Sequence, residues 1–497
     1  MSCSKIFSGD LPELTYEVIK YFRNDKSTLH SCILVNRLWC RLAIPLLWED
    51  PFSFRTVICN FIGIYLHNLN DDDLKSKLNQ HIINNNSLPS NTLFNYVKFL
   101  KYLNIFDIIS CVGMWFTIKK SEPGNNDFSA TDFKRLIGIS LFKIFIENEV
   151  NLHTLEIEIS SIYYYTYFND ILEIILQNTN FIHNISNLNL YVNSSIRFSY
   201  DIINNEYMLI KNLSNCSNTL NTITFYNIDF KVVINLDKIF EQLNVLESVH
   251  IIHCYSLKNG FDQFNNLTKP FKLKSLIINE LSQIDNSLQL LLQKSGDYLE
   301  NFGYTLGILS NLSQNRQLLD LIIKYCENIK FLNFFGSESH IFYQTFNIPN
   351  LIENIKQNLK YLSINLCDDV YLSNDNISIL LQNLGQTLPS KLEYLSLVFN
   401  IKENDFRIFL ENSHNIFINK LKIMQTSSDN ILNNVKEYIM KEKRVKYLAI
   451  WDFKNGDLSR LKYEVKEFNL YNIKVLNYHD LSLAFDVYNL LKKIDYL

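Results

Sequence analysis

The sequence predicts an α/β fold in which short strands stack into a parallel sheet and helices cover its outer face. The first observation is the phrase LKYLSINLC at Leu359, which has the form L-x-x-L-x-I-x-x-C. The second is that related phrases recur through most of the 497-residue chain. The third is that segments with helical periodicity separate the phrases. Repeats of a strand followed by a helix are typical of a solenoid.

The first fifty residues predict three short helices. Pro12 suits the first turn of a helix, where its missing N–H is not needed, and apolar residues follow at helical spacing. Ser27 and Asn36 are candidate N-caps of the second and third helices. Pro45 is expected to interrupt the third helix. Because three helices of this size bury little area, we expect them to need a packing partner.

Residues 7–50 resemble an F-box. The matching features are the pair Leu11–Pro12, the run Val35-Asn36-Arg37-x-Trp39 and the terminal pair Leu47–Trp48. The resemblance implies docking onto a Skp-type adaptor of a cullin–RING ubiquitin ligase. It implies that six residues face the adaptor: Leu11, Pro12, Leu14, Leu29, Cys32 and Val35. The alternative is a small helical cap that turns every apolar residue inward, although such a cap would not require Leu11–Pro12.

Residues 51–150 lack the repeat phrase and are predicted to form a helical linker and N-terminal cap. A repeat array needs its first apolar edge covered, which gives this region a role. Trp115 and Phe116 are expected in the core. The predicted helices cover Phe54–Leu69, the surroundings of Leu93–Leu103 and Asp132–Asn148, and the predicted loops include Asn70–Asp73 and Lys119–Thr131.

Residues 151–497 form the predicted repeat array. Its phrases share an apolar first residue, and their starts lie 26 to 35 residues apart: Leu152, Ile185, Leu220, Leu246, Leu273, Leu299, Ile329, Leu359, Leu392, Ile418, Val445 and Ile473. Alternate residues of a strand point to opposite faces, so the last two apolar residues of a phrase face one side. One unit cannot bury that side alone, whereas stacked neighbours form a continuous core.

Helices are predicted between these phrases. The segments with helical spacing are Phe168–Gln177, Leu236–Leu243, Leu288–Gln293, Leu318–Tyr325, Ile377–Leu384 and Ile431–Met440. The alternation resembles the longer, helix-containing leucine-rich repeats over about seventy per cent of the chain. That resemblance implies a solenoid with a parallel sheet on its concave face and helices outside. It also implies structural roles for Asn193, Cys254, Cys367 and Asn400, which occupy the position that often holds Asn or Cys in that family.

The strand positions that point away from the core are expected to form the concave surface. In the later repeats these positions carry aromatic residues: Phe331, Phe335, Tyr361, Tyr394, Tyr447 and Trp451. Exposed aromatic residues are typical of interaction hot spots, so we predict that a target protein docks on them. The alternative is that composition bias places aromatic residues there and they bind nothing.

Composition and cysteine usage predict a soluble protein of the cytoplasm or nucleus. The net charge of −4 provides no global basic field for nucleic acid or for an anionic membrane. The nine cysteines are scattered without a C-x-x-C pair, which favours a reducing compartment over disulfides or zinc. The N-terminus lacks the apolar run of a signal peptide, and Ile105–Ile118 is too short to span a bilayer.

Motifs of catalysis and cofactor binding are absent from the sequence. It contains no P-loop, dinucleotide fingerprint, H-E-x-x-H or G-x-S-x-G. His250 and His253 fall on opposite faces of one predicted strand, which does not suit a shared metal. Asp71–Asp73 is expected to be a loop or a helix cap. We therefore expect no catalytic residue, no metal and no cofactor.

The two resemblances together are those of an F-box/leucine-rich-repeat protein of fungal type. They imply a non-catalytic substrate-recognition subunit of an SCF ubiquitin ligase, which presents a target protein for ubiquitin-dependent degradation. The alternative function is a leucine-rich-repeat scaffold or receptor that is not associated with a ubiquitin ligase.

Overall fold

The fold was analysed in a computed structural model. It describes residues 11–23, 25–53, 61–81, 92–119, 130–159, 165–192, 212–231, 233–269, 271–279, 286–306, 312–336, 348–366, 375–425, 430–452 and 455–481. Packing divides the chain into two units. The first unit contains residues 1–228 and 232–246, and the second contains residues 229–231 and 247–497. Both units combine parallel strands with helices, and each is described by itself.

The described part of the first unit begins with three helices, α2 (Pro12–Lys20), α3 (Lys26–Ile33) and α4 (Arg37–Leu47). The side chain of Asn36 caps α4 by accepting a 2.9 Å hydrogen bond from the backbone N–H of Trp39, as predicted. The cap of α3 is Asp25 rather than the predicted Ser27, since its carboxylate accepts a hydrogen bond from the N–H of Thr28. The hydrogen bond from the Thr28 hydroxyl, together with the one from its N–H, holds the pKa of Asp25 below its usual value.

Helix α4 continues through Pro45, contrary to the predicted interruption. Pro45 lies two residues before the end of α4, so few of the helix's hydrogen bonds lie beyond it. Packing against α2 and α3 holds the rest of α4 in place. The buried residues of this three-helix core are Ile19, Leu29, Cys32, Trp39, Ala43 and Leu46.

Further described helices of the first unit accompany a short parallel sheet. They are α5 (Phe61–Leu66), α6 (Asp72–His81), α7 (Ile105–Lys119), α8 (Ala130–Glu147), α9 (Tyr165–Gln177) and α11 (Leu236–Phe240), with 3-10 turns η1 (Tyr96–Phe99), η3 (Thr179–Phe181) and η5 (Asn212–Cys216). Asp71 caps α6 through the N–H of Leu74 and binds the Lys143 amine of α8 at 3.1 Å. Asp71 is therefore a helix cap, one of the two alternatives predicted for Asp71–Asp73, and Asn70 precedes the helix.

The strands of the first unit are β1 (Tyr102–Asn104), β2 (Thr154–Ile159), β3 (Asn187–Val192) and β4 (Thr222–Tyr226). Each pairs in parallel with the next in chain order. Strand β1 lies where the sequence analysis expected a helix and no repeat phrase. Leu100, Leu103 and Ile105 are all buried, so this segment repeats the L-x-x-L-x-I pattern one unit earlier than predicted. Trp115 is buried as expected, whereas Phe116 is partly exposed.

The second unit continues the strand–helix alternation. Its strands are β5 (Ser248–Ile252), β6 (Lys272–Asn279), β7 (Asn301–Leu306), β8 (Phe331–Gly336), β9 (Tyr361–Leu366), β10 (Lys391–Phe399), β11 (Phe417–Gln425), β12 (Val445–Asp452), β13 (Gly456–Asp457) and β14 (Lys474–Val475). Strands β5 to β12 pair in parallel in chain order. Beyond β12, β13 pairs with it antiparallel and β14 pairs with it in parallel.

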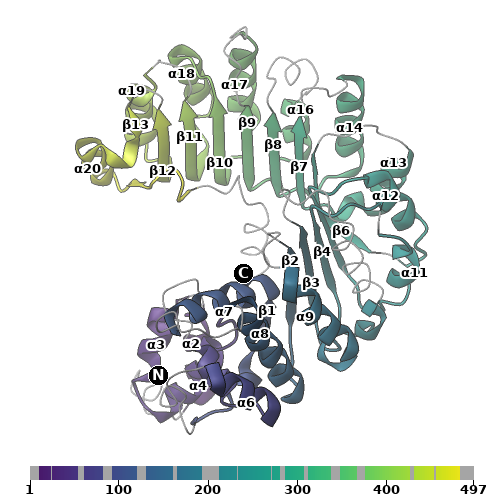
Figure 1. The fold of residues 1–497 in the computed structure, drawn as a ribbon. Helices are drawn as coiled ribbons and strands as arrows, with labels where there is room; N and C mark the ends of the chain where they lie inside the picture. The colour runs from purple at the N-terminus through teal and green to yellow at the C-terminus, as the bar shows by residue number, and fades with distance from the viewer. Residues whose placement is uncertain are drawn as a thin grey trace. The chain divides into compact units, whose positions relative to one another are not determined.

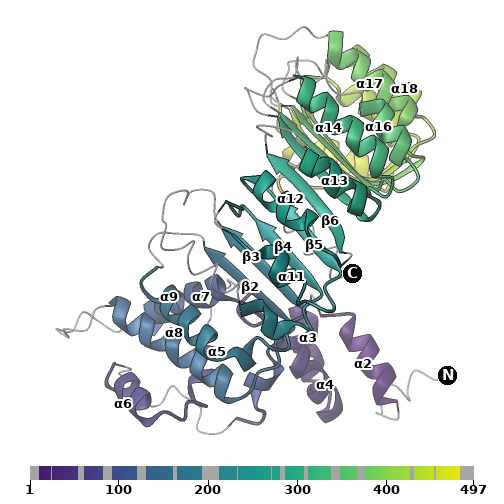
Figure 2. The same cartoon turned by 90° about the vertical axis from the view of Figure 1, so that its right-hand side faces the viewer.

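Helices cover the outer side of this sheet. They are α12 (Leu257–Asn265), α13 (Asn286–Ser295), α14 (Leu312–Tyr325), α16 (Ile348–Ile355), α17 (Asp375–Thr387), α18 (Glu403–Asn412), α19 (Leu432–Asn434) and α20 (Lys462–Leu470), with the π-helical turn η7 (Val435–Met440) and the 3-10 turns η6 (Gly296–Tyr298) and η8 (Leu458–Arg460). Figure 1 shows α16, α17 and α18 on the outer side of the strands, and Figure 2 shows them in a row with α13 and α14. Of these, α12, α16, α18 and α20 were not predicted.

The register between strands aligns the apolar residues into two buried rows. One row contains Leu276, Phe302, Leu332, Leu362, Leu395, Leu421 and Leu448. The other contains Ile278, Tyr304, Phe334, Ile364, Leu397, Ile423 and Ile450. All of these side chains are buried, which confirms the stacked parallel core. Every predicted phrase also coincides with a strand, from β2 at Leu152 to β14 at Ile473.

Cys254, predicted to be structural, is buried, and its thiol lies 3.5 Å from the carbonyl of Ile252. Asn400 is partly buried beyond β10. Asn193 and Cys367 lie outside the described residues. Within the described ranges, no helix combines the length and the apolar character that crossing a bilayer requires.

Two helical glycines give a test of the packing. A Cβ on Gly385 of α17 would lie 2.7 Å from the Asn412 Cβ and 2.9 Å from the Phe409 carbonyl of α18. We predict that Gly385→Ala lowers the free energy of unfolding by about 1–2 kcal/mol, because overpacking outweighs the gain in helix propensity. Chemical denaturation followed by circular dichroism measures the change.

The matched control is Gly113→Ala in α7, where a Cβ meets no atom within 4 Å. This variant keeps the propensity gain of up to about 1 kcal/mol without the clash. Equal effects of the two substitutions would contradict the close approach of α17 and α18.

Candidate protein-binding surfaces

The structure separates the six residues predicted to face an adaptor into two groups. Pro12, Leu14 and Val35 are exposed, and Leu11 is partly exposed at the start of α2. Leu29 and Cys32 lie instead in the three-helix core and offer no surface to a partner. Burial also raises the pKa of the Cys32 thiol. These two residues fix the position of α3 rather than forming part of an exposed surface.

Three exposed apolar residues in α2 and at its C-cap lie on one face of that helix. Leu14, Val18 and Tyr21 are spaced four and three residues apart, which places them on the same side. Leu14 is 44% exposed and Val18 is 42% exposed, whereas Ile19, on the other side, is fully buried. Apolar residues in this number on one exposed helix face indicate a contact surface.

A second exposed apolar pair follows α3. Leu34 is 76% exposed and Val35 is 51% exposed in the turn between α3 and α4. Leu34, like Val18 and Tyr21, was not among the predicted adaptor residues. Helical spacing showed that Val18 shares a face with Leu14, but only packing shows that this face is left uncovered. The name apolar helix surface is used below for the two exposed sets together: Leu14, Val18 and Tyr21 on one, Leu34 and Val35 on the other.

The aromatic residues predicted to bind a target all lie on the inner face of the second unit's sheet. Register aligns the side chains of this face in three rows, and the aromatic residues lie in the first and the third. The first row contains His250, Ser275, Asn301, Phe331, Tyr361, Tyr394, Lys420 and Tyr447. The third row contains Thr305, Phe335, Asn365, Val398, Met424 and Trp451. The structure therefore brings the six predicted residues onto one face of neighbouring strands.

Their accessibility differs. Phe331 and Tyr394 are buried, whereas Phe335, Tyr361, Tyr447 and Trp451 are partly exposed. Burial raises the pKa of the Tyr361 hydroxyl. The sequence analysis expected this whole set to be open to a partner.

The chain's own C-terminal segment, Leu476–Leu481, accounts for part of this burial. Leu481 packs with Tyr394 and Ala449 in one cluster, and Tyr361 and Leu476 pack against it. The Tyr394 hydroxyl donates a 3.2 Å hydrogen bond to the carbonyl of Leu481. The sequence analysis did not foresee this contact, because nothing in the repeat pattern indicates where residues after the last phrase go.

A middle row of mostly polar residues lies between the two aromatic rows: Asn333, Ser363, Ser396, Lys422 and Ala449. The hydroxyls of Ser363 and Ser396 are buried and have no hydrogen-bond partner among the described residues. An unpaired buried hydroxyl is unfavourable, and a bound group that reaches it would gain a hydrogen bond.

Lys422 is almost completely buried in this middle row, and burial lowers the pKa of its amine to about 8. Its Nζ lies 4.0 Å from the centroid of the Tyr478 ring, which is a cation–π contact. The C-terminal segment therefore contacts both the first row, through Leu481, and the middle row, through Tyr478.

At the other end of the first row, three polar side chains form a hydrogen-bonded chain. The His250 Nδ1 lies 2.8 Å from the Ser275 hydroxyl, which accepts a 2.9 Å hydrogen bond from the Asn301 amide. Burial, together with the nearby Lys274 amine, lowers the pKa of His250 to about 4. A neutral imidazole held in this way is a structural group of the sheet.

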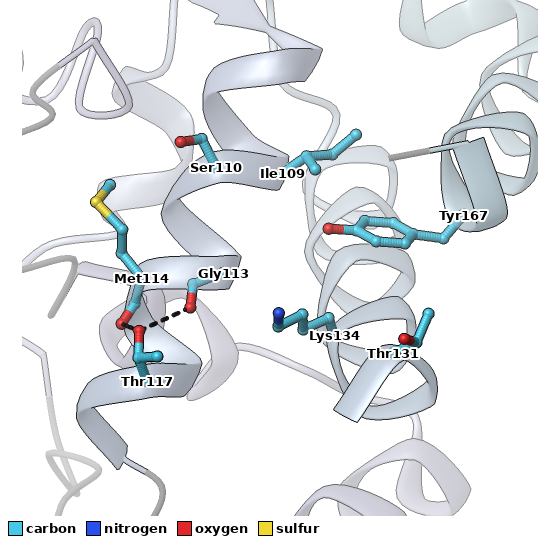
Figure 3. A pocket seen from close by; sticks show the side chains of 8 residues that line it. All are labelled: Ile109, Ser110, Gly113, Met114, Thr117, Thr131, Lys134 and Tyr167. Atoms are coloured by element: carbon cyan, nitrogen blue, oxygen red, sulfur yellow. Dashed lines mark hydrogen bonds between the residues drawn. The ribbon is translucent and has the colours of Figure 1, made fainter. Parts of the chain in front are cut away.

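A cavity of about 300 Å³ lies between α7 and α8, with Tyr167 of α9 in its wall. Figure 3 shows the side chains that line it. Its wall includes the Lys134 amine, which lies 5.3 Å from the Phe116 ring. The Thr117 hydroxyl points back to the carbonyls of Gly113 and Met114 within its own helix. Among the eight lining residues only Lys134 and Tyr167 are ionisable.

No set of three or more His, Cys, Asp or Glu side chains suited to a metal ion occurs within the residues that the structure describes. His250 is buried on the inner face, whereas His253 has a positive φ of 54° beyond the end of β5. The candidate binding surfaces are the apolar helix surface and the inner sheet face. A scan of protein-family models finds none that matches the chain, and a search of curated proteins finds no similar sequence.

His250 gives a pH-dependent prediction. The unfolded imidazole, with a pKa of 6.5, takes up a proton that the folded one resists down to about pH 4. The folded state therefore loses stability as the pH falls from 6.5 to 4, by at most about 1.4 kcal/mol per pH unit. We predict that His250→Gln makes this loss shallower in denaturation curves measured across that range.

The control variant is His30→Gln, which removes a histidine from the exposed side of α3. Parallel curves for wild type and His250→Gln would mean that the imidazole is not held neutral in the sheet.

Proposed function

We propose that this protein is a non-catalytic substrate-recognition subunit of an SCF-type cullin–RING ubiquitin ligase. The observation that carries the proposal is the apolar helix surface on a three-helix unit whose other side is fully packed. A helical cap would turn its apolar residues inward, whereas Leu14, Leu34 and Val35 point outward. This exposure favours docking onto a Skp-type adaptor over a sealing role.

In this proposal the adaptor contacts Leu11, Pro12, Leu14 and Val35, together with Val18 and Leu34. Leu29 and Cys32 support the surface from behind, since they lie in the core between the helices. Burial of large apolar side chains at the centre of such a contact is the usual source of binding energy. The chain would act in the cytoplasm or nucleus, where this class of ligase works.

The target would bind the inner sheet face of the second unit. Phe335, Tyr447 and Trp451 are partly exposed there and supply rigid aromatic contacts. The function needs no chemistry of its own, because holding a target near the ubiquitin-transfer machinery raises its effective concentration.

The proposal is tested by copurification with a purified Skp-type adaptor. We predict that the wild-type chain retains the adaptor and that the double variant Leu14→Glu/Val35→Glu reduces retention at least about ten-fold, since two charges must then be desolvated. Both residues are exposed, so the fold should tolerate the changes. Circular dichroism verifies that the variant remains folded.

The matched control is Leu470→Glu on α20, which introduces the same charge at a side chain that is 81% exposed. It should leave retention unchanged. Failure of the wild-type chain to retain any adaptor would overturn the proposal and favour a repeat scaffold outside the ligase system.

A further inference from the structure

The C-terminal segment leaves the sheet at its last strand and turns back over the inner face. Strand β14 pairs with β12, and the N–H of Leu476 then bonds to the carbonyl of Leu448 at 2.8 Å. From there the chain crosses toward β11 and β10 within the same unit. The chain thus passes from strand β14 at the edge of the sheet onto the inner face.

A short turn sets the shape of the segment. The Asn477 side chain accepts a hydrogen bond from the N–H of His479, and the Asn477 carbonyl accepts one from the N–H of Leu481. The N–H of Tyr478 donates to the Asp457 carboxylate at 2.9 Å. The turn directs Tyr478 and Leu481 toward the sheet, while His479 and Asp480 remain exposed.

Two inward side chains and one backbone group of the segment contact β10 and β11. Tyr478 lies over the Lys422 amine, and Leu481 fills the space beside Tyr394. The Tyr394 hydroxyl bonds to the Leu481 carbonyl rather than to a side chain. This combination of two apolar anchors and one backbone hydrogen bond is how a groove holds a peptide.

The inner face beneath the segment also retains unused polar groups. The Ser363 and Ser396 hydroxyls are buried beside Lys422 in the middle row without a described partner. In a protein core such hydroxyls are normally paired by hydrogen bonds. On a ligand-binding surface they can instead remain unpaired until a ligand bonds to them. The segment therefore covers this face but leaves these two hydroxyls without a described hydrogen-bond partner.

We propose that the inner face of β9 to β12 is a peptide-binding groove, which the C-terminal segment occupies within its own chain. The preferred ligand is a peptide with an aromatic residue and, three positions later, an aliphatic one, as in Tyr478-His479-Asp480-Leu481. A target carrying this pattern displaces the segment. The inference deepens the proposed function by naming the class of target peptide, and it otherwise rests on the second unit alone.

The test uses a chain truncated after Val475 and a fluorescently labelled peptide of residues 476–497, which is the sequence that the truncation removes. Fluorescence anisotropy should show saturable binding of the peptide to the truncated chain. Binding to the full-length chain should be at least about ten-fold weaker, because its own segment competes. No adaptor is present, so the result is independent of the ligase proposal.

Substitutions in the peptide locate the anchors. Tyr478→Ala and Leu481→Ala should each weaken binding at least about ten-fold, as expected for the loss of a buried anchor. The matched control His479→Ala changes an exposed side chain and should stay within about two-fold. On the protein side, Lys422→Gln should weaken binding of the wild-type peptide much more than binding of the Tyr478→Ala peptide.

Two results would overturn the inference. One is a folded truncated chain that does not bind the peptide, and the other is equal binding by the truncated and full-length chains. If the truncated chain fails to fold, hydrogen exchange in the full-length chain tests the inference instead. The amides of Tyr478 to Leu481 should then exchange faster than those of β10 and β11, through local opening. Exchange only with global unfolding would make the segment a permanent part of the core.

Discussion

The register between neighbouring parallel strands is the constraint on which the rest of the structure depends. In the second unit it places Leu332, Leu362 and Leu395 side by side, so that each repeat buries the apolar face that its neighbour cannot bury alone. A slip of one residue in any strand would turn its leucines to the inner face and its polar residues into the core. Every second strand residue must be apolar because it packs in the core. The residue types at the alternate positions can therefore differ between repeats.

Those alternate positions form the inner face, and their freedom explains its mixed chemistry. The middle row combines serines with a lysine, and the rows on either side hold most of the aromatic residues. Position on this face does not make a side chain accessible, since Tyr394 is buried beneath Leu481 while Trp451 remains partly exposed. The same logic holds for the three helices, where Leu29 and Leu14 are both apolar but only Leu14 remains exposed.

Features that depend on local pattern could be predicted, and features that depend on distant packing could not. The phrase at Leu359 predicted β9 and its buried side chains, and Asn36 predicted the start of α4. Strand β1 was missed although Leu100, Leu103 and Ile105 carry the same spacing, because a helical pattern overlaps them. Periodicity assigned residues to a common face, but it could not show which face is buried by other parts of the chain. The contact of Tyr394 with Leu481 joins residues 87 positions apart, and no local signal anticipates it.

The central claim is the proposal that one chain carries an adaptor surface on helices α2 to α4 and a target surface on the inner sheet face. Hydrogen exchange of the full-length chain, with and without a purified Skp-type adaptor, tests it most directly. The account predicts that the adaptor slows exchange in α2 and in the turn at Leu34–Val35, and leaves β9 to β12 unchanged. Unchanged exchange in α2 at saturating adaptor, or protection confined to the sheet, would contradict it.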